Sequence, residues 1–417
     1  MSKWNIYTPD GMQDILFEDC YLKRELEEKI RGLFRSFAYK EVETPTIEFY
    51  DLFSSMGYNL RQEEMFKFTD RQGRLIVLRP DITVPVARVN ETKNVNKDYP
   101  AKYSYIGNSF KANESGGGKL HEFTEAGVEV FGINSSEADA EVIYTAIRTV
   151  LLSGIADFQI EIGHVKFLEG ILDDTDLSEE KREEIRGYIT TKSYIAIDEF
   201  LKDNQLKDYV KNIISRIPYL SGGKEVLAEL DLLPLKGRAK EALLELKELY
   251  SILADYGVEE YVTVDFGIVP RVDYYTGILF RGFTYGIGFQ ILQGGRYDTM
   301  SEQIGNSCPA VGFSIGINLL LMAMDRQKIS GETLRIDTLV GYSPSYRNKA
   351  FSIAEKLRAQ GIFVEIDIVK KEYEDLQKHA KDRGIGGLIY VDENGQIRTY
   401  NAITCDEEIY MDEGEFI

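Results

Sequence analysis

Cysteine, histidine and long apolar runs are all scarce in this sequence. The 417 residues contain three cysteines, Cys20, Cys308 and Cys405, and none of them stands at a paired spacing. This excludes a disulfide framework and favours a reducing compartment. No stretch approaches the roughly 20 apolar residues that span a bilayer, and the start MSKWNIYTPD lacks the basic-then-apolar order of a signal peptide. We therefore expect a cytoplasmic protein with no membrane association.

Metal ligands and excess positive charge are also lacking. The three histidines, His121, His164 and His379, do not stand at metal-ligand spacing from a cysteine or from one another, so we expect no metal site. The formal net charge of −20 weighs against tight binding to a polyanion such as nucleic acid. With 43% hydrophobic residues, the chain is long enough to form two or three globular domains.

Periodicity along the chain predicts alternating helical and β-rich blocks. Apolar residues recur at helical spacing from Cys20 to Phe37. Two β-rich runs, Tyr103 to Phe110 and Glu122 to Phe131, predict a long antiparallel hairpin whose tip holds Gly116 to Gly118. A serine at 135 or 136 predicts the cap of a helix that runs to about Leu152.

The second half of the chain begins with a change of pattern. Charged helical runs occupy Val165 to about Tyr256, which predicts a helical insertion. β-rich sequence returns from Tyr261 to Leu292, and Gly312 to Met324 reads as a buried apolar helix. From Arg335, strands and helices alternate in a small α/β unit, and the acidic end from 406 to 415 is predicted to be a solvated tail or an edge.

Five strings in this order resemble the signatures of class II aminoacyl-tRNA synthetases, and of the histidyl enzyme in particular. They are the first helix and strand (20–46), YIGNSFK…GGGKLHEFTEAGVEVFG (105–132), RVDYYTG (271–277), GGRYD (294–298) and AVGFSIGINLL (310–320). The resemblance covers nearly the whole chain. It implies an α+β fold, with an antiparallel sheet flanked by helices, and a dimer formed through the first string.

The resemblance also implies three domains. The synthetase-like core comprises residues 1–164 and 257–330, the helical insertion comprises 165–256, and an anticodon-binding-like α/β domain comprises 333–417. The last domain carries more acidic than basic residues, so binding of tRNA is not expected.

Positions that bind ATP in the synthetase family are altered here. Lys111 and Asn113 stand in place of an arginine and a glutamate, and Leu319 replaces the arginine that holds the γ-phosphate. Pro270 stands where histidyl enzymes have an arginine, and the neighbouring Arg271 points to the opposite face if this stretch is a strand. Lysine cannot make the bidentate phosphate contact of arginine. The resemblance therefore implies a catalytically silent protein with no nucleotide or other cofactor.

Positions that bind the amino acid are largely retained. The resemblance implies that six residues bind histidine: Asp81, Thr83, Glu125, Glu129, Tyr275 and Tyr297. It implies a supporting role for Arg271, Arg296 and Asp298.

The residues themselves leave other interpretations open. Glu125 and Glu129 could equally lie on the wet face of a sheet, and Asp81 could simply cap the next helix. Only one of Tyr274 and Tyr275 can face a pocket, because adjacent residues of a strand point oppositely.

This pattern resembles the regulatory subunits of the short form of ATP phosphoribosyltransferase, a family related to histidyl-tRNA synthetase. The resemblance implies that the chain binds the short catalytic subunit, forms a dimer and takes histidine as an allosteric ligand. The alternative is an active histidyl-tRNA synthetase. A tRNA-independent ligase or a sensor of uncharged tRNA is a third possibility, because fold alone does not settle function.

Overall fold

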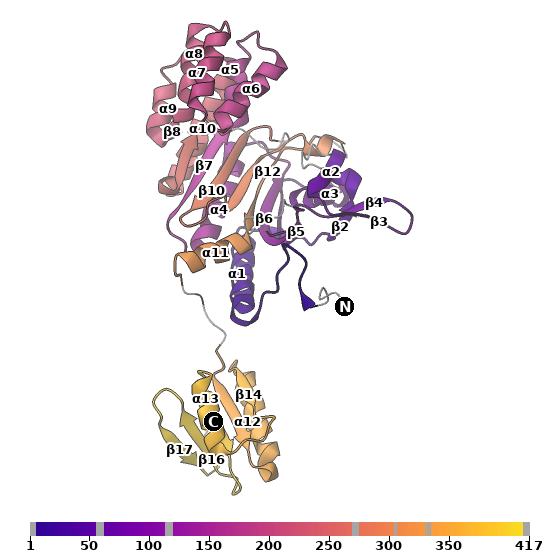
Figure 1. The fold of residues 1–417 in the computed structure, drawn as a ribbon, viewed down its shortest axis with the longest axis vertical. Helices are drawn as coiled ribbons and strands as arrows, with labels where there is room; N and C mark the ends of the chain where they lie inside the picture. The colour runs from indigo at the N-terminus through magenta and orange to yellow at the C-terminus, as the bar shows by residue number, and fades with distance from the viewer. Residues whose placement is uncertain are drawn as a thin grey trace. The chain divides into compact units, whose positions relative to one another are not determined.

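The computed structural model describes residues 6–55, 62–112, 120–268, 275–303, 307–329, 331 and 335–411. The chain forms two compact units, Met1–Gly331 and Glu332–Ile417. Each unit has buried hydrophobic clusters of its own. The first unit contains a large sheet with helices around it, and the second is a small α/β unit (Figure 1).

A nine-stranded sheet organises the first unit, in the order β1-β5-β6-β12-β11-β10-β7-β9-β8. The β1–β5 and β7–β9 pairs are parallel and the others are antiparallel. In sheet order the strands are β1 (Lys40–Glu41), β5 (Ala101–Phe110), β6 (Glu122–Phe131), β12 (Ala310–Gly316), β11 (Leu292–Arg296), β10 (Ile278–Thr284), β7 (Phe158–His164), β9 (Val262–Asp265) and β8 (Ser221–Gly222). The α+β fold predicted from the resemblance is confirmed.

The predicted hairpin forms the adjacent strands β5 and β6, next to the edge strand β1 of this sheet. β5 and β6 pair in register from Ala101 opposite Phe131 to Phe110 opposite Glu122. The tip that holds Gly116 to Gly118 lies outside the described residues. The prediction of a helix from Gly312 to Met324 is wrong at its start, because residues up to Gly316 belong to β12 and the helix begins at Ile317. An unbroken apolar run does not show whether it is buried in a strand or in a helix.

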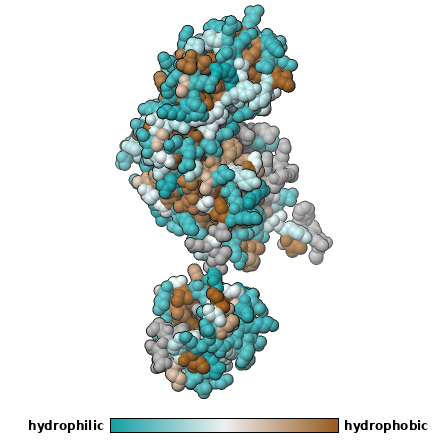
Figure 2. Space-filling model, turned by 90° about the vertical axis from the view of Figure 1, so that its left-hand side faces the viewer, coloured by the Kyte–Doolittle hydropathy of each residue, from teal (hydrophilic) through white to brown (hydrophobic). Residues whose placement is uncertain are grey.

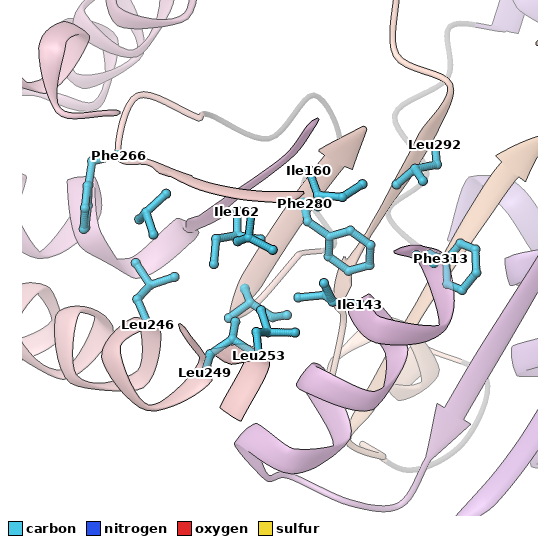
Figure 3. Close-up of a cluster of buried hydrophobic side chains, with 14 of the residues drawn as sticks. Ile143, Ile160, Ile162, Leu246, Leu249, Leu253, Phe266, Phe280, Leu292 and Phe313 are labelled. Atoms are coloured by element: carbon cyan, nitrogen blue, oxygen red, sulfur yellow. The ribbon is translucent and has the colours of Figure 1, made fainter. Parts of the chain in front are cut away.

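Helices α1 (Phe17–Ser36), α4 (Ser136–Leu152) and α11 (Ile317–Arg326) pack against the sheet. The Ser135 Oγ accepts the Ala138 N–H at 3.2 Å, which confirms the predicted serine cap of α4. Figure 3 shows Ile143 of α4 facing Phe280 and Phe313 of the sheet, all three buried. The main core of the unit therefore lies between these helices and the sheet.

A run of helices joins β7 to β9 in the first unit. The helices are α5 (Val165–Leu172), α6 (Glu179–Thr190), α7 (Tyr194–Asp203), α8 (Asp208–Arg216), α9 (Lys224–Leu230) and α10 (Gly237–Asp255). In Figure 1, α5 to α8 gather beyond the end of β7, and α10 runs back toward the sheet. α5 and α10 approach closely at Gly170, where a Cβ atom would lie 2.2 Å from the Ala239 nitrogen. Buried leucines of α10 join the core of the sheet (Figure 3).

A second, smaller layer covers the β5 end of the sheet. It contains α2 (Tyr50–Ser55), α3 (Thr83–Lys93) and a three-stranded sheet in the order β2 (Ile47–Phe49), β4 (Leu75–Leu78) and β3 (Lys67–Thr69). Val84 and Val86 of α3 pack in a cluster with Tyr105 of β5 and with Tyr297. This cluster places the start of α3 over β5 and β6.

The second unit has a five-stranded sheet in the order β14-β13-β15-β16-β17, with helices α12 (Arg347–Ala359) and α13 (Tyr373–Asp382) packed against it. The strands are β13 (Thr338–Tyr342), β14 (Val364–Ile366), β15 (Gly387–Val391), β16 (Ile397–Asn401) and β17 (Glu407–Tyr410). The acidic end thus contributes an edge strand, one of the two predicted outcomes.

Hydrophilic residues cover most of the face shown in Figure 2, and hydrophobic residues form separate small patches. None of the described helices is long and apolar enough to cross a bilayer. No group of three or more His, Cys, Asp or Glu side chains in the described ranges is arranged to hold a metal ion.

Candidate functional site

A small acidic cavity, here called the inner cavity, lies between β6, β11, β12 and the start of α3. Its free volume is about 30 Å³, which is room for a water molecule or two. The lining residues are Asp81, Thr83, Lys111, Glu125, Glu129, Tyr275, Gln293, Gly294, Tyr297, Gly312, Phe313 and Ser314. All six residues predicted to bind histidine are therefore brought together.

Glu129 of β6 is the most enclosed of these residues, with none of its surface exposed. The Thr83 Oγ1 donates to its Oε1 at 2.7 Å, the Tyr105 hydroxyl donates to the same oxygen at 3.3 Å, and the Tyr297 hydroxyl donates to Oε2. Burial raises the pKa of Glu129 to about 8, although the hydrogen bonds act in the opposite direction. The carboxyl group is therefore mostly protonated at neutral pH.

A glycine on the neighbouring strand makes room for this carboxyl group. Gly312 pairs with Glu129 across β12 and β6, and a Cβ atom at Gly312 would lie 1.6 Å from the Glu129 Oε2. Any side chain there would displace the carboxyl group. Gly295 of β11 makes similar room, since a Cβ atom there would lie 2.7 Å from the Tyr275 ring.

Glu125 lies four residues before Glu129, two repeats of the pleat away and on the same face of β6. It is 7% exposed, and the Ser109 Oγ donates to its Oε2 at 2.7 Å. Burial raises the pKa of Glu125, and the nearby Lys111 ammonium opposes that rise. Because both glutamates are buried in the cavity wall, the alternative of a wet sheet face is wrong.

Asp81 combines the two roles that the sequence left open. Its Oδ1 accepts the Val84 N–H at 3.0 Å at the start of α3, and its side chain also lines the inner cavity. A helix N-terminus holds a carboxylate favourably. Capping the helix and lining the cavity are therefore compatible.

Arg296 and Asp298 stand behind the cavity wall and do not line it. The Arg296 Nη2 donates to the Asp139 Oδ1 at 2.6 Å, and its Nη1 donates to the Asp298 Oδ1 at 3.2 Å. The same Asp298 oxygen accepts the Ala310 N–H at 3.0 Å. Burial raises the pKa of Asp139 to about 6 against the pull of Arg296. This ion-pair cluster links α4, β11 and β12 directly beside Tyr297.

The structure adds residues that the sequence did not predict for the site. Tyr105 and Ser109 of β5 donate hydrogen bonds to the two buried glutamates, and Asp139, in the first turn of α4, pairs with Arg296. Strand alternation opposite Glu125 and Glu129 is the signal that could have found the β5 pair. Three predicted positions, Asn113, Pro270 and Arg271, lie outside the described residues.

A larger space, here called the outer cavity, adjoins the inner cavity and has a free volume of about 520 Å³. Its lining residues are Lys111, Leu120, Phe123, Glu125, Phe289, Gln290, Ile291, Leu292, Gln293, Ser314, Gly316, Asn318, Leu319 and Met322. Lys111, Glu125, Gln293 and Ser314 line both cavities. Of all the described residues in the two linings, Lys111 is the only lysine or arginine.

Comparisons with known proteins agree with this architecture. The family model described as histidyl-tRNA synthetase matches residues 11–320. A histidyl-tRNA synthetase structure from Nostoc superposes with a TM-score of 0.82 at 19% identity, covering 97% of both chains, which supports the fold alone. A Bacillus halodurans structure, described as an ATP phosphoribosyltransferase regulatory subunit/histidyl-tRNA synthetase, gives a TM-score of 0.81 at 29% identity and covers 93% of this chain and 97% of its own.

Curated relatives are more similar in sequence. The ATP phosphoribosyltransferase regulatory subunit of Acetivibrio thermocellus is 49% identical over 401 residues, and that of Ruminiclostridium cellulolyticum is 46% identical over the same length. Each alignment covers 96% of this chain and 96% of the relative. The fold and the family model place this protein in the class built on the histidyl-tRNA synthetase scaffold. Within that class, the chain belongs to the family of ATP phosphoribosyltransferase regulatory subunits.

Proposed function

We propose that this chain is a non-catalytic subunit that activates the short catalytic subunit of ATP phosphoribosyltransferase and transmits feedback inhibition by histidine. The reaction joins ATP to phosphoribosyl pyrophosphate in the first step of histidine biosynthesis. Near-full-length relatives at 46% and 49% identity carry the name of this subunit. In the chain itself, the supporting observation is a buried acidic cavity around Glu129.

Histidine recognition in the inner cavity follows from the chemistry of its walls. Glu129, Tyr275 and Tyr297 offer a carboxyl group and two phenols to an imidazole ring. Asp81, Thr83 and Glu125 offer oxygen acceptors to an ammonium group. A carboxyl group and hydroxyls match an imidazole because each of its ring nitrogens needs one partner.

The cavity must open to admit this ligand. A free volume of about 30 Å³ is too small for an amino acid. In addition, Glu129 already accepts hydrogen bonds from the hydroxyls of Thr83 and Tyr297. Binding therefore exchanges internal hydrogen bonds for ligand hydrogen bonds. We propose that the histidine-free and histidine-bound forms of this network are the two states that the catalytic subunit senses.

The outer cavity supports a non-catalytic role. Amino-acid activation places a polyphosphate and its developing charge in the active site, and several preorganised cations stabilise such a transition state. Lys111 is the only lysine or arginine among the described lining residues, and Leu319 presents an apolar side chain there. We therefore propose that ATP is not a ligand of this chain.

Regulation through this site requires coupling between two ligands. Histidine must bind the inhibited complex more tightly than the active one, and couplings of about 1–3 kcal/mol are typical. Because linkage is reciprocal, phosphoribosyl pyrophosphate should weaken histidine binding to the assembled complex by roughly 5- to 150-fold. Calorimetric titration of the complex with histidine, with and without phosphoribosyl pyrophosphate, measures this ratio. Equal affinities would contradict the proposed coupling.

A second candidate, an active histidyl-tRNA synthetase, is supported by the family model that matches residues 11–320. It predicts histidine-dependent exchange of pyrophosphate into ATP, whereas the regulatory role predicts none. An assay of pyrophosphate exchange on the purified chain therefore distinguishes the two candidates.

We further propose that the chain forms a dimer that involves α1. We also propose that it is cytoplasmic and that it does not bind tRNA.

A further inference from the structure

The outer cavity is larger than a nucleotide-free histidine sensor requires. Its free volume of about 520 Å³ lies within the range of sites that enclose small molecules, roughly 300–1,000 Å³. The walls come from the hairpin, from the segment before β11 and from the start of α11. Among the described residues, seven large apolar side chains line the cavity beside the polar or charged Lys111, Glu125, Gln290, Gln293 and Asn318: Leu120, Phe123, Phe289, Ile291, Leu292, Leu319 and Met322.

The start of α11 is fixed to the hairpin beside this space. The Asn318 Oδ1 accepts the Thr124 N–H at 2.8 Å, which ties α11 to β6. Leu319 follows directly and lines the outer cavity. The apolar wall is thus anchored to the strand that carries Glu125 and Glu129.

Lys111 stands where the two cavities meet. It lines both of them, and its ammonium lies 5.5 Å from the centre of the Phe123 ring. This ammonium acts electrostatically on the nearby Glu125, but in the described part of the chain it forms no ion pair within 4 Å. A ligand carboxylate at the junction would therefore find a cation there, with an aromatic ring behind it.

Neither free histidine nor a nucleoside triphosphate matches the walls of the outer cavity. Free histidine, held by the residues of the inner cavity, leaves the apolar walls of the outer cavity uncovered. A triphosphate would bring several negative charges to a space whose described lining offers one lysine and the buried Glu125. Together the two cavities offer acidic and hydroxyl side chains for a cationic head, apolar side chains for a tail, and one lysine for a negative charge.

We propose that the outer cavity is a subsite for the tail of a histidine extended at its carboxyl group, such as a dipeptide of histidine followed by a large apolar residue. The histidyl head occupies the inner cavity, the second side chain packs on Phe289, Leu319 and Met322, and the terminal carboxylate pairs with Lys111. This rests on the proposed histidine site for the position of the head. It assigns a ligand class to the outer cavity, which histidine alone does not fill.

The test is a calorimetric titration of the full chain with four probes: histidine, histidyl-glycine, histidyl-phenylalanine and histidyl-phenylalaninamide. Burial of a phenylalanine side chain should make histidyl-phenylalanine bind roughly tenfold or more tighter than histidyl-glycine. The amide lacks the terminal carboxylate and should bind about tenfold weaker than the free acid. In Lys111→Met, the acid and the amide should bind equally.

A matched pair of variants separates the outer cavity from general surface effects. Phe289 lines the cavity and is 48% exposed, whereas Tyr285 is 72% exposed and is not among the lining residues. Phe289→Glu should remove the advantage of histidyl-phenylalanine over histidyl-glycine and leave histidine affinity unchanged. Tyr285→Glu should leave all four affinities unchanged.

The outcomes test two claims separately: the subsite in the outer cavity and the histidine site in the inner cavity. If histidine binds but the two dipeptides bind equally and Phe289→Glu has no effect, the subsite is overturned and the histidine site stands. If the dipeptide binds and histidine does not, the subsite stands and the proposed feedback role fails. If no probe binds, both are overturned.

Discussion

Glu129 illustrates how burial determines the chemistry of a single side chain in this protein. The carboxyl group is fully enclosed and is surrounded by the hydroxyls of Thr83, Tyr105 and Tyr297. Burying a charged carboxylate in such a place costs free energy. Burial therefore raises the pKa of Glu129 to about 8, and the group keeps its proton at neutral pH. Protonation of Glu129 therefore reduces the negative charge of the cavity before a ligand enters.

Replacement of this side chain should change how stability depends on pH. The pKa of Glu129 is about 8 in the folded chain and near 4.5 when unfolded, so the folded state holds one more proton between these values. Its stabilising effect is present below pH 4.5 and is lost as pH rises through 8. In Glu129→Gln, the fall in unfolding free energy between pH 4.5 and 8 should be smaller than in wild type by roughly 3–5 kcal/mol. Urea denaturation across this range measures the difference, and parallel curves for the two proteins would contradict the buried-acid account.

The ion pair behind the cavity gives a second prediction for single residues. Arg296→Met leaves Asp139 buried without its charged partner, and loss of one partner of a buried pair costs roughly 3–5 kcal/mol. Adding Asp139→Leu to Arg296→Met should recover most of this loss, since the unpaired Asp139 carboxylate is then removed. A double-mutant cycle from thermal or urea unfolding provides the coupling energy. Additive effects of the two substitutions would show that the pair is not coupled.

The chemical types at the site are readable from the sequence, but the hydrogen-bond partners are not. Glu125, Glu129 and Tyr297 stand in recognisable strings, and the structure encloses all three in one cavity. Ser109 reaches Glu125 only because β5 and β6 pair in one particular register, and Asp139 reaches Arg296 across 157 positions of the chain. Strand alternation could have placed Ser109 on the same face as Glu125, but the register of the pair and the contact between Asp139 and Arg296 depend on tertiary packing, which no local pattern encodes.

At the scale of elements, α10 couples the helical run to the sheet. Leu246, Leu249 and Leu253 form the buried stripe of this helix and meet Ile162 of β7 in one cluster (Figure 3). The stripe follows helical spacing, as an amphipathic helix requires. The opposite face of α10 is exposed at Leu244.

This arrangement predicts a sharp contrast between two leucines on the same helix. Leu246→Ala should lower the free energy of unfolding by about 2–5 kcal/mol, because Leu246 is fully buried and its truncation leaves a cavity. Leu244→Ala, at a side chain that is 52% exposed, should change it by less than about 0.5 kcal/mol. Chemical denaturation of the two variants measures both values. Similar losses in the two variants would mean that α10 packs in another orientation.

Local pattern predicts some elements of this fold well and others poorly. The hairpin and the serine-capped α4 follow from alternation and capping chemistry, and the structure has both. The junction between β12 and α11 does not follow, because residues 310–324 are apolar on both sides of Gly316 and carry no boundary signal. β16 was not predicted, because its polar residues become a strand only by pairing with β15 and β17.

At the scale of the whole molecule, the two compact units carry separate cores. The clusters of the first unit and those of the second share no residue. A unit with its own core can fold independently. A chain that ends at Gly331 should therefore unfold cooperatively and bind histidine as the full chain does. Circular dichroism melting and histidine titration of this shorter chain test the expectation, which a broad, non-cooperative melt would contradict.

The most direct test of the central claim is a steady-state assay of the short catalytic subunit of ATP phosphoribosyltransferase, mixed with this chain or with Glu129→Gln, over a series of histidine concentrations. The account predicts that both proteins activate the catalytic subunit and that only the wild-type chain makes the activity sensitive to histidine. Activation without histidine sensitivity in the wild type, or equal sensitivity in Glu129→Gln, would contradict the assignment of feedback to the inner cavity.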